Sequence, residues 1–265
     1  MISINILIMT DAEGLCGIYQ NEQVKATHPL YGECRRYMTR QINELAAGFK
    51  GAGVEHVYVR DCHGGACSAI WEDISADVDR IIQGDTGTNR MPYIESVDAV
   101  ALLGYHAMAG TPTAVLEHTM MSTLWQKFMI HDTEAGEILL DASIAGDYGK
   151  PVILVAGDDY ACAEAERQIP GVVTAQLKEA MSCYGASMLS PSAAYALLRK
   201  KAAEAVTAYP SIQPIVQPKP VVLSLELIER GQLPHPETKP YMKITGPRSY
   251  QVEGSSVAEA LFRLF

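Results

Sequence analysis

Apolar runs alternate with segments whose apolar residues recur at helical spacing. The runs that predict buried strands are residues 2–9, 54–60, 97–103 and 151–156. The segments that predict helices are residues 32–50, 161–168 and 190–208, the last after a Ser-Pro cap signal. Strands alternating with helices predict an α/β fold with a mixed, mostly parallel sheet flanked by helices.

Beyond about residue 125, the pattern of apolar and polar residues is less regular. Residues 127–130 and 137–139 predict a hairpin, or a strand that enters a helix. A proline-rich stretch at 210–220 is typical of a linker, and the tail beyond it predicts strands and one short helix. We therefore expect a catalytic α/β domain over residues 1–209. Residues 210–265 are expected to pack on it or to form a small α+β subdomain.

Charge and cysteine content indicate which partners are disfavoured and in which cell compartment the protein is expected. The formal charge of −10 disfavours binding to nucleic-acid phosphates and to anionic lipids. The six cysteines form no Cys-x-x-Cys pair, which favours free thiols in a reducing compartment. The apolar start has no basic flank or cleavage site, and no run is long enough to cross a bilayer. We expect a cytoplasmic protein.

Four segments place metal-ligand side chains at or beyond predicted strand ends. They carry Asp11 and Glu13, His63, His106 and Glu137. Loops at the strand ends of one sheet converge, so ligands distant in sequence can meet there. Two carboxylates as close as Asp11 and Glu13 repel one another unless a cation lies between them. The two histidines add the nitrogen ligands that zinc prefers.

Each of these segments has a simpler interpretation when it is taken alone. An Asp-x-Glu after a strand is commonly a turn or a helix cap, and a single histidine there is commonly a hydrogen-bonded loop residue. Asp158 and Asp159 are expected to cap a helix, and Cys62 is expected to be structural. The residues themselves therefore predict a possible metal site and no specific reaction.

Five motifs in a fixed order point further. Asp11 begins Asp-x-Glu-Gly-x-x-Gly, His63 ends Asp-x-His, and His106 lies in Gly-Tyr-His-Ala. His118 begins His-Thr-Met, and Glu137 ends Gly-Glu. In this order, the motifs resemble the zinc-dependent D-aminopeptidases of the M55 peptidase family. The resemblance extends from the first strand to about residue 191.

The resemblance implies a site with two zinc ions per subunit. Asp11 matches the carboxylate that bridges the two ions. Glu13 and His106 match the other ligands of one ion, and His63 and Glu137 match those of the second. These ions would serve an aminopeptidase that removes N-terminal residues from short peptides, with the preference for D-residues resting on the resemblance alone.

The same resemblance assigns two further properties. His118 matches a histidine with an active-site role beside the metals, and the family is similar in forming ring-shaped homodecamers. Asp141 is a departure, because an asparagine is expected at that position. A changed charge behind the ligands would alter the surroundings of the metals while leaving every matched ligand in place.

Two other functions remain open. A two-metal phosphoesterase also uses Asp and His ligands, but Arg60 is the one basic residue beside the metal motifs. A non-catalytic peptide-binding protein with structural zinc is the second alternative. Structural zinc sites are closed and often rich in cysteine, so a His and carboxylate set favours an open, catalytic site.

Overall fold

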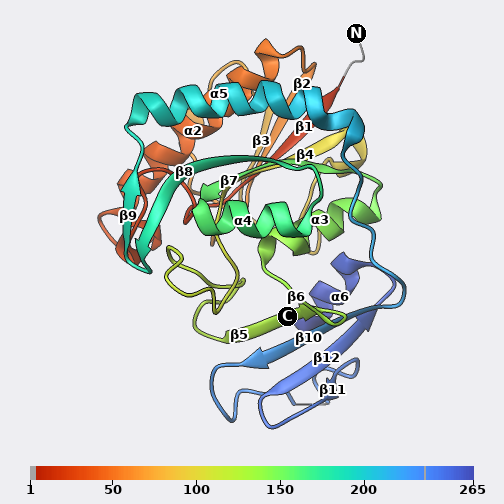
Figure 1. The fold of residues 1–265 in the computed structure, drawn as a ribbon. Helices are drawn as coiled ribbons and strands as arrows, with labels where there is room; N and C mark the ends of the chain where they lie inside the picture. Colours follow the sequence, from red (N-terminus) through yellow and green to blue (C-terminus); the bar gives the residue numbers. More distant parts are fainter. Residues whose placement is uncertain (1–3, 236) are drawn as a thin grey trace.

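The computed structural model describes residues 4–235 and 237–265, so residues 2 and 3 of the first predicted strand lie outside it (Figure 1). The main sheet has seven strands in the order β3-β2-β1-β4-β7-β8-β9, and all adjacent pairs are parallel except β8 and β9. Its strands are β1 (Asn5–Thr10), β2 (His56–Asp61), β3 (Arg80–Ile82), β4 (Ala99–Tyr105), β7 (Val152–Asp158), β8 (Val173–Ser182) and β9 (Gly185–Met188). The predicted mixed, mostly parallel sheet is confirmed.

Helices cover both faces of this sheet. The helices are α1 (Asn21–Val24), α2 (Tyr31–Gly51), α3 (Glu137–Asp147), α4 (Asp159–Gln168), α5 (Pro191–Ala208) and α6 (Val257–Leu264). Alternate β1 residues point to opposite sides, so Ile6 and Ile8 join the core under α2 and α5, whereas Leu7 and Met9 join the core under α3 and α4. Burial on both faces explains why the central strands are continuous apolar runs.

A second, antiparallel sheet of five strands lies beside the first (Figure 1). Its order is β11 (Lys243–Ile244), β12 (Ser249–Gly254), β10 (Val221–Leu227), β5 (Trp125–Ile130) and β6 (Thr133–Glu134). The strands expected beyond residue 220 and the short final helix are present. Because β5 and β6 lie far upstream of the tail in the sequence, the tail completes a sheet that residues 125–134 begin. The domain boundary at residue 209 stays a prediction.

The final helix divides its apolar residues between core and surface. Leu261 and Leu264 are buried in the core shared with α3 and β10. Phe262 and Phe265 are 58% and 56% exposed. Leu261 and Leu264 therefore pack in the chain's own core, whereas Phe262 and Phe265 are largely exposed, with the Phe265 ring also stacked on Trp125 of β5.

Several short elements complete the description. The 3-10 helices are η1 (Trp71–Asp73), η2 (Ile94–Ser96) and η3 (Tyr209–Ser211). All six cysteines are free thiols, as expected. None of the helices in the described part of the chain is long and apolar enough to cross a bilayer.

Candidate metal centre

The predicted ligands come together because the strands that carry them are neighbours. β1 lies between β2 and β4 and runs parallel to both, and Thr10 pairs with Asp61 on one side and Leu103 on the other. The segments just beyond these three strands therefore emerge at one edge of the sheet. They carry Asp11, His63 and His106, and Glu137 joins them from the first turn of α3.

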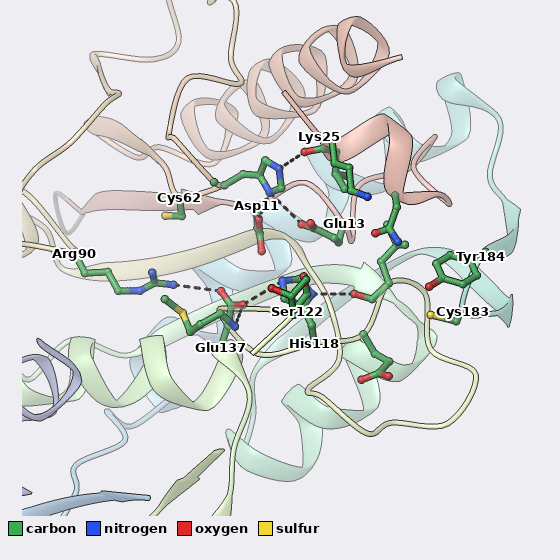
Figure 2. Close-up of a pocket in the computed structure, with 18 residues that line it drawn as sticks. Asp11, Glu13, Lys25, Cys62, Arg90, His118, Ser122, Glu137, Cys183 and Tyr184 are labelled. Atoms are coloured by element: carbon green, nitrogen blue, oxygen red, sulfur yellow. Dashed lines mark hydrogen bonds and ion pairs between the residues drawn. The ribbon is translucent and has the colours of Figure 1, made fainter. Parts of the chain in front are cut away.

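These side chains surround a cavity of about 670 Å³ (Figure 2). Asp11, Glu13, His63, His118 and Glu137 line it. His106 lies behind this wall with only 1% of its surface exposed. The geometry brings all six predicted site residues into one cluster.

Close contacts join the histidines to the carboxylates. His63 Nδ1 lies 3.1 Å from Asp11 Oδ1 and 3.2 Å from Glu13 Oε2. His106 Nε2 lies 3.4 Å from both Asp11 Oδ2 and Glu137 Oε1. Asp11 thus faces His63 through one carboxylate oxygen and His106 through the other.

Each of the three histidines has one ring nitrogen turned to a backbone carbonyl. His63 Nε2 lies 2.8 Å from Val24 O, His106 Nδ1 lies 3.0 Å from Ala107 O, and His118 Nδ1 lies 2.9 Å from Leu116 O. A carbonyl only accepts hydrogen bonds, so the nitrogen facing it carries the proton. The other nitrogen of each ring faces the carboxylates, and it is the atom whose lone pair a bound metal would take, as in metal-ligating histidines.

The charges within the cluster are strongly coupled. Burial lowers the pKa of His106, but the nearby carboxylates of Asp11 and Glu137 outweigh burial and hold this pKa well above its usual value. Burial likewise lowers the pKa of His63, and Glu13 and Asp11 together raise it well above normal. Three buried carboxylates thus favour any cation placed among them.

The two acids that share His106 respond in the opposite sense. Burial raises the pKa of Asp11, yet His106 and His63 bring it well below its usual value. Burial also raises the pKa of Glu137, but His106 outweighs burial and lowers this pKa to about 2. Both carboxylates are therefore ionised at neutral pH, the form in which a metal binds them.

The donor set fits zinc. Donor atoms of Asp11, Glu13 and His106 lie within 4.8 Å of one another, and so do donor atoms of His106, His118 and Glu137. Two buried atoms in the cluster, Glu13 Oε2 and His106 Nε2, have no hydrogen-bond partner of suitable geometry despite their nearby neighbours. Buried polar atoms without partners are costly, and bound metal would satisfy them. The division of ligands between two ions stays a prediction.

Arg90 is the main neighbour of the site that the sequence did not reveal. Its Nε and Nη2 donate to Asp141 at 2.5 Å and 2.8 Å, and Nη2 also lies 3.5 Å from Glu137 Oε2. Tyr105 donates its hydroxyl proton to Asp141 as well, at 2.5 Å. Asp141 follows Glu137 by one helical turn, so the acidic pair was visible in the sequence, but the loop that supplies Arg90 had no recognisable pattern.

The loop that carries His118 is held in an unusual backbone conformation. Thr113, Leu116 and Met120 have positive φ angles of 66°, 52° and 57°. Leu116 N donates to Cys183 O, and Met120 N donates to Glu137 Oε1. Strained backbone of this kind persists where surrounding contacts impose it, commonly at functional sites. The contacts here place the His118 ring on His106, with ring centroids 4.1 Å apart.

Three further expectations have clear outcomes. Asp158 caps α4 by accepting a hydrogen bond from Ala161 N, as predicted. Burial raises the pKa of the Cys62 thiol, which agrees with a structural role. Arg60, the basic residue beside the metal motifs, donates a hydrogen bond to the backbone carbonyl of Gly84.

A family model, a relative of known sequence and a solved structure all relate this chain to D-aminopeptidases. A family model described as D-aminopeptidase, peptidase M55, matches residues 4–265. A D-aminopeptidase of Bacillus subtilis strain 168 is 34% identical over 260 residues, covering 96% of this chain and 93% of the relative. The solved structure of the Zn-dependent D-aminopeptidase DppA from Bacillus subtilis, described as a self-compartmentalizing protease, superposes with a TM-score of 0.92. It is 33% identical, and the match covers 98% of this chain and 95% of that one.

Proposed function

The chain belongs to the M55 family of D-aminopeptidases, and on this premise we propose that it uses two zinc ions to release the N-terminal residue of short peptides. The observation that best supports this proposal is that three buried carboxylates and three histidines form one cluster beside one cavity. Aminopeptidase activity follows from the family. The number of metal ions and the roles of individual residues are the proposal.

We carry the division of the ligands over from the family's motifs. Asp11 would bridge the two ions, Glu13 and His106 would complete one set, and His63 and Glu137 would complete the other. Zinc at such a site supplies a Lewis acid for the carbonyl oxygen and for water, whose pKa it lowers to about 7. The carboxylates of Asp11, Glu13 and Glu137 would offset most of the positive charge of two zinc ions.

His118 is the proposed proton carrier. Its Nδ1–H is engaged by Leu116 O, so Nε2 is the nitrogen that exchanges protons, and this atom lies 3.8 Å from Glu137 Oε1. Unlike the almost fully buried His106, His118 lines the cavity. Imidazole exchanges protons near neutral pH, as a step that must first take and then release a proton requires.

Arg90 bears on the phosphoesterase alternative. Its guanidinium is bound by Asp141 and faces Glu137, so it is not an uncommitted anion site. Turnover of an amino-acid p-nitroanilide without turnover of p-nitrophenyl phosphate is expected. The reverse result would favour the phosphoesterase.

We also propose a D-residue preference and a ring-shaped homodecamer. Both draw support from relatives, one described as a D-aminopeptidase and one as self-compartmentalizing. The outward-facing Phe262 and Phe265 are available for subunit contacts. Light scattering at micromolar concentration tests the assembly, and a monomer mass would contradict it.

One experiment tests the enzyme and its metals together. The purified protein is stripped with a chelator, reloaded with measured amounts of zinc, and assayed on D-Ala-D-Ala and L-Ala-L-Ala. We expect activity to reach its maximum at two zinc ions per chain, with the D-dipeptide preferred. Saturation at one zinc ion would refute the two-metal site, and full activity in the stripped protein would refute zinc dependence.

A further inference from the structure

A lysine lies buried behind the loop that carries Asp11 and Glu13. Lys178, on β8, has only 2% of its surface exposed. Its Nζ donates to three backbone carbonyls, those of Glu13 at 2.5 Å, Leu15 at 3.1 Å and Ile18 at 2.7 Å. An ammonium has three N–H donors, so all of them are used on one short segment.

The three carbonyls accept the hydrogen bonds of Lys178, while the charge of Asp158 acts from beyond ion-pair distance. Among the described residues, no carboxylate lies within ion-pair distance of Nζ, although burying an unpaired charge is costly. Asp158, its partner in the β7–β8 register, directs its carboxylate to Val115 N and Ala161 N instead. Lys178 and the segment of residues 11–18 therefore stabilise one another.

That segment has no regular secondary structure of its own. On its other side, Asp11 N and Gly14 N donate to Leu103 O and Gly104 O, both at 2.8 Å. The fit against β4 is close, because a Cβ at Gly14 would stand only 1.8 Å from Tyr105 O. The segment is thus fastened between β4, which accepts from its N–H groups, and Lys178, which donates to its carbonyls.

We propose that Lys178 is a positioning residue that holds the main chain of this segment so that Asp11 and Glu13 are placed for metal binding before any metal arrives. The proposal rests on the zinc site proposed above. Loss of the ammonium leaves three carbonyls without their donor, and the segment relaxes. Binding zinc must then reorder it, which weakens affinity. Residues that orient metal ligands typically contribute about 10- to 100-fold in affinity.

The first measurement uses the unaltered, metal-free protein. Amide hydrogen exchange reports whether a segment is already ordered. We expect the amides of Asp11 and Gly14 to be protected to a degree similar to those of β1. Exchange at the rate of an unstructured chain would overturn the proposal, because the loop would then be ordered by metal and not by Lys178.

The second measurement compares variants. Lys178→Met keeps the length of the side chain but removes the ammonium, and zinc affinity is measured by competition with a chromogenic chelator. We expect zinc to bind about 10- to 100-fold more weakly, with faster exchange over residues 11–18 and an altered absorption spectrum of the Co²⁺-loaded protein. Unchanged zinc affinity in a folded Lys178→Met protein would overturn the proposal.

Two controls separate positioning from general stability. Leu223→Ala creates a cavity in the core of the second sheet, distant in the fold from the 11–18 segment, and lowers overall stability. Lys127→Met removes a lysine from a surface ion pair with Glu134. Both should retain normal zinc affinity. If Leu223→Ala weakens zinc affinity as much as Lys178→Met does, the positioning role is refuted.

If the unaltered protein itself binds no zinc, the proposed function fails instead, while the exchange data still decide whether the segment is pre-ordered. Should Lys178→Met not fold, the exchange measurement on the unaltered protein carries the test.

Discussion

Arg90 and Asp141 form a largely buried, two-point ion pair behind Glu137, with N–O distances of 2.5 Å and 2.8 Å. Charge and hydrogen bonding from Asp141 overcome the effect of burial and hold the pKa of Arg90 well above its usual value. The same guanidinium faces Glu137 Oε2. The departure at position 141 therefore has a partner in this chain, and that partner also touches a proposed metal ligand.

Breaking this pair from one side is expected to be costly. Arg90→Met leaves the Asp141 carboxylate buried with only Tyr105 as a donor, and removing one partner of a buried pair typically costs about 3–5 kcal/mol. The double variant Arg90→Met/Asp141→Leu should recover much of that loss, since no charge is left unpaired. Urea unfolding of the two single variants and the double variant measures the coupling. Additive losses would show that the pair is not coupled.

The fold was largely predictable because its central strands are buried on both faces. Such strands appear in the sequence as continuous apolar runs, and the strands at 54–60 and 97–103 were found within about two residues of their ends. β8 was missed for the opposite reason. Its apolar residues alternate with the polar Thr174, Gln176 and Lys178, so β8 forms no continuous apolar run.

The site was predictable where ligands follow strands, and not where they are supported by loops. Asp11, His63 and His106 all lie just beyond strands that were recognised. Arg90 and the carbonyl contacts of Lys178 depend on long-range packing, which leaves no local pattern. Residue 141 was noticed only as a departure, and the charge that accompanies it became visible only in three dimensions.

Asp11→Asn should be the most damaging change to the metal site. Asp11 faces His63 and His106 from opposite sides, so weakening this ligand disturbs both proposed ions. We expect the variant to lose both zinc ions, whereas Glu13→Gln should lose chiefly one. Elemental analysis after gel filtration gives the zinc content per chain. An Asp11→Asn protein with two zinc ions and normal activity would show that Asp11 does not bridge them.

Glu164 predicts a specific dependence of stability on pH. Burial raises its pKa to about 7, more than the hydrogen bond from Met108 N lowers it. Because this folded-state pKa exceeds the unfolded value, the folded state holds the proton more tightly. The resulting stabilisation is present below about pH 4 and is lost as pH rises through about 7.

Glu164→Gln should remove that dependence. Its amide oxygen can still accept from Met108 N, and the side chain never ionises. Relative to the unaltered protein, its free energy of unfolding should therefore improve by about 3 kcal/mol between pH 5 and pH 8. Urea unfolding of the metal-free proteins at a series of pH values measures this. Glu166→Gln, at an exposed position of the same helix, is the matched control, and an equal effect there would contradict the assignment to Glu164.

His118 gives the sharpest test of mechanism, because its location permits two roles. Its ring stacks on His106 and its Nε2 lies 3.8 Å from Glu137 Oε1, so a metal ligand and a proton carrier are both geometrically reasonable. The order of the motifs, in which His118 matches an active-site histidine beside the metals, favours the proton carrier. His118→Ala should then retain its zinc and its fold but lose about 10²- to 10⁴-fold in kcat, the usual contribution of a positioned acid or base. His63→Ala and His106→Ala should lose zinc as well. Loss of zinc from His118→Ala would make this histidine a ligand. Retention of both zinc and kcat would make it structural, and another group would have to carry the proton.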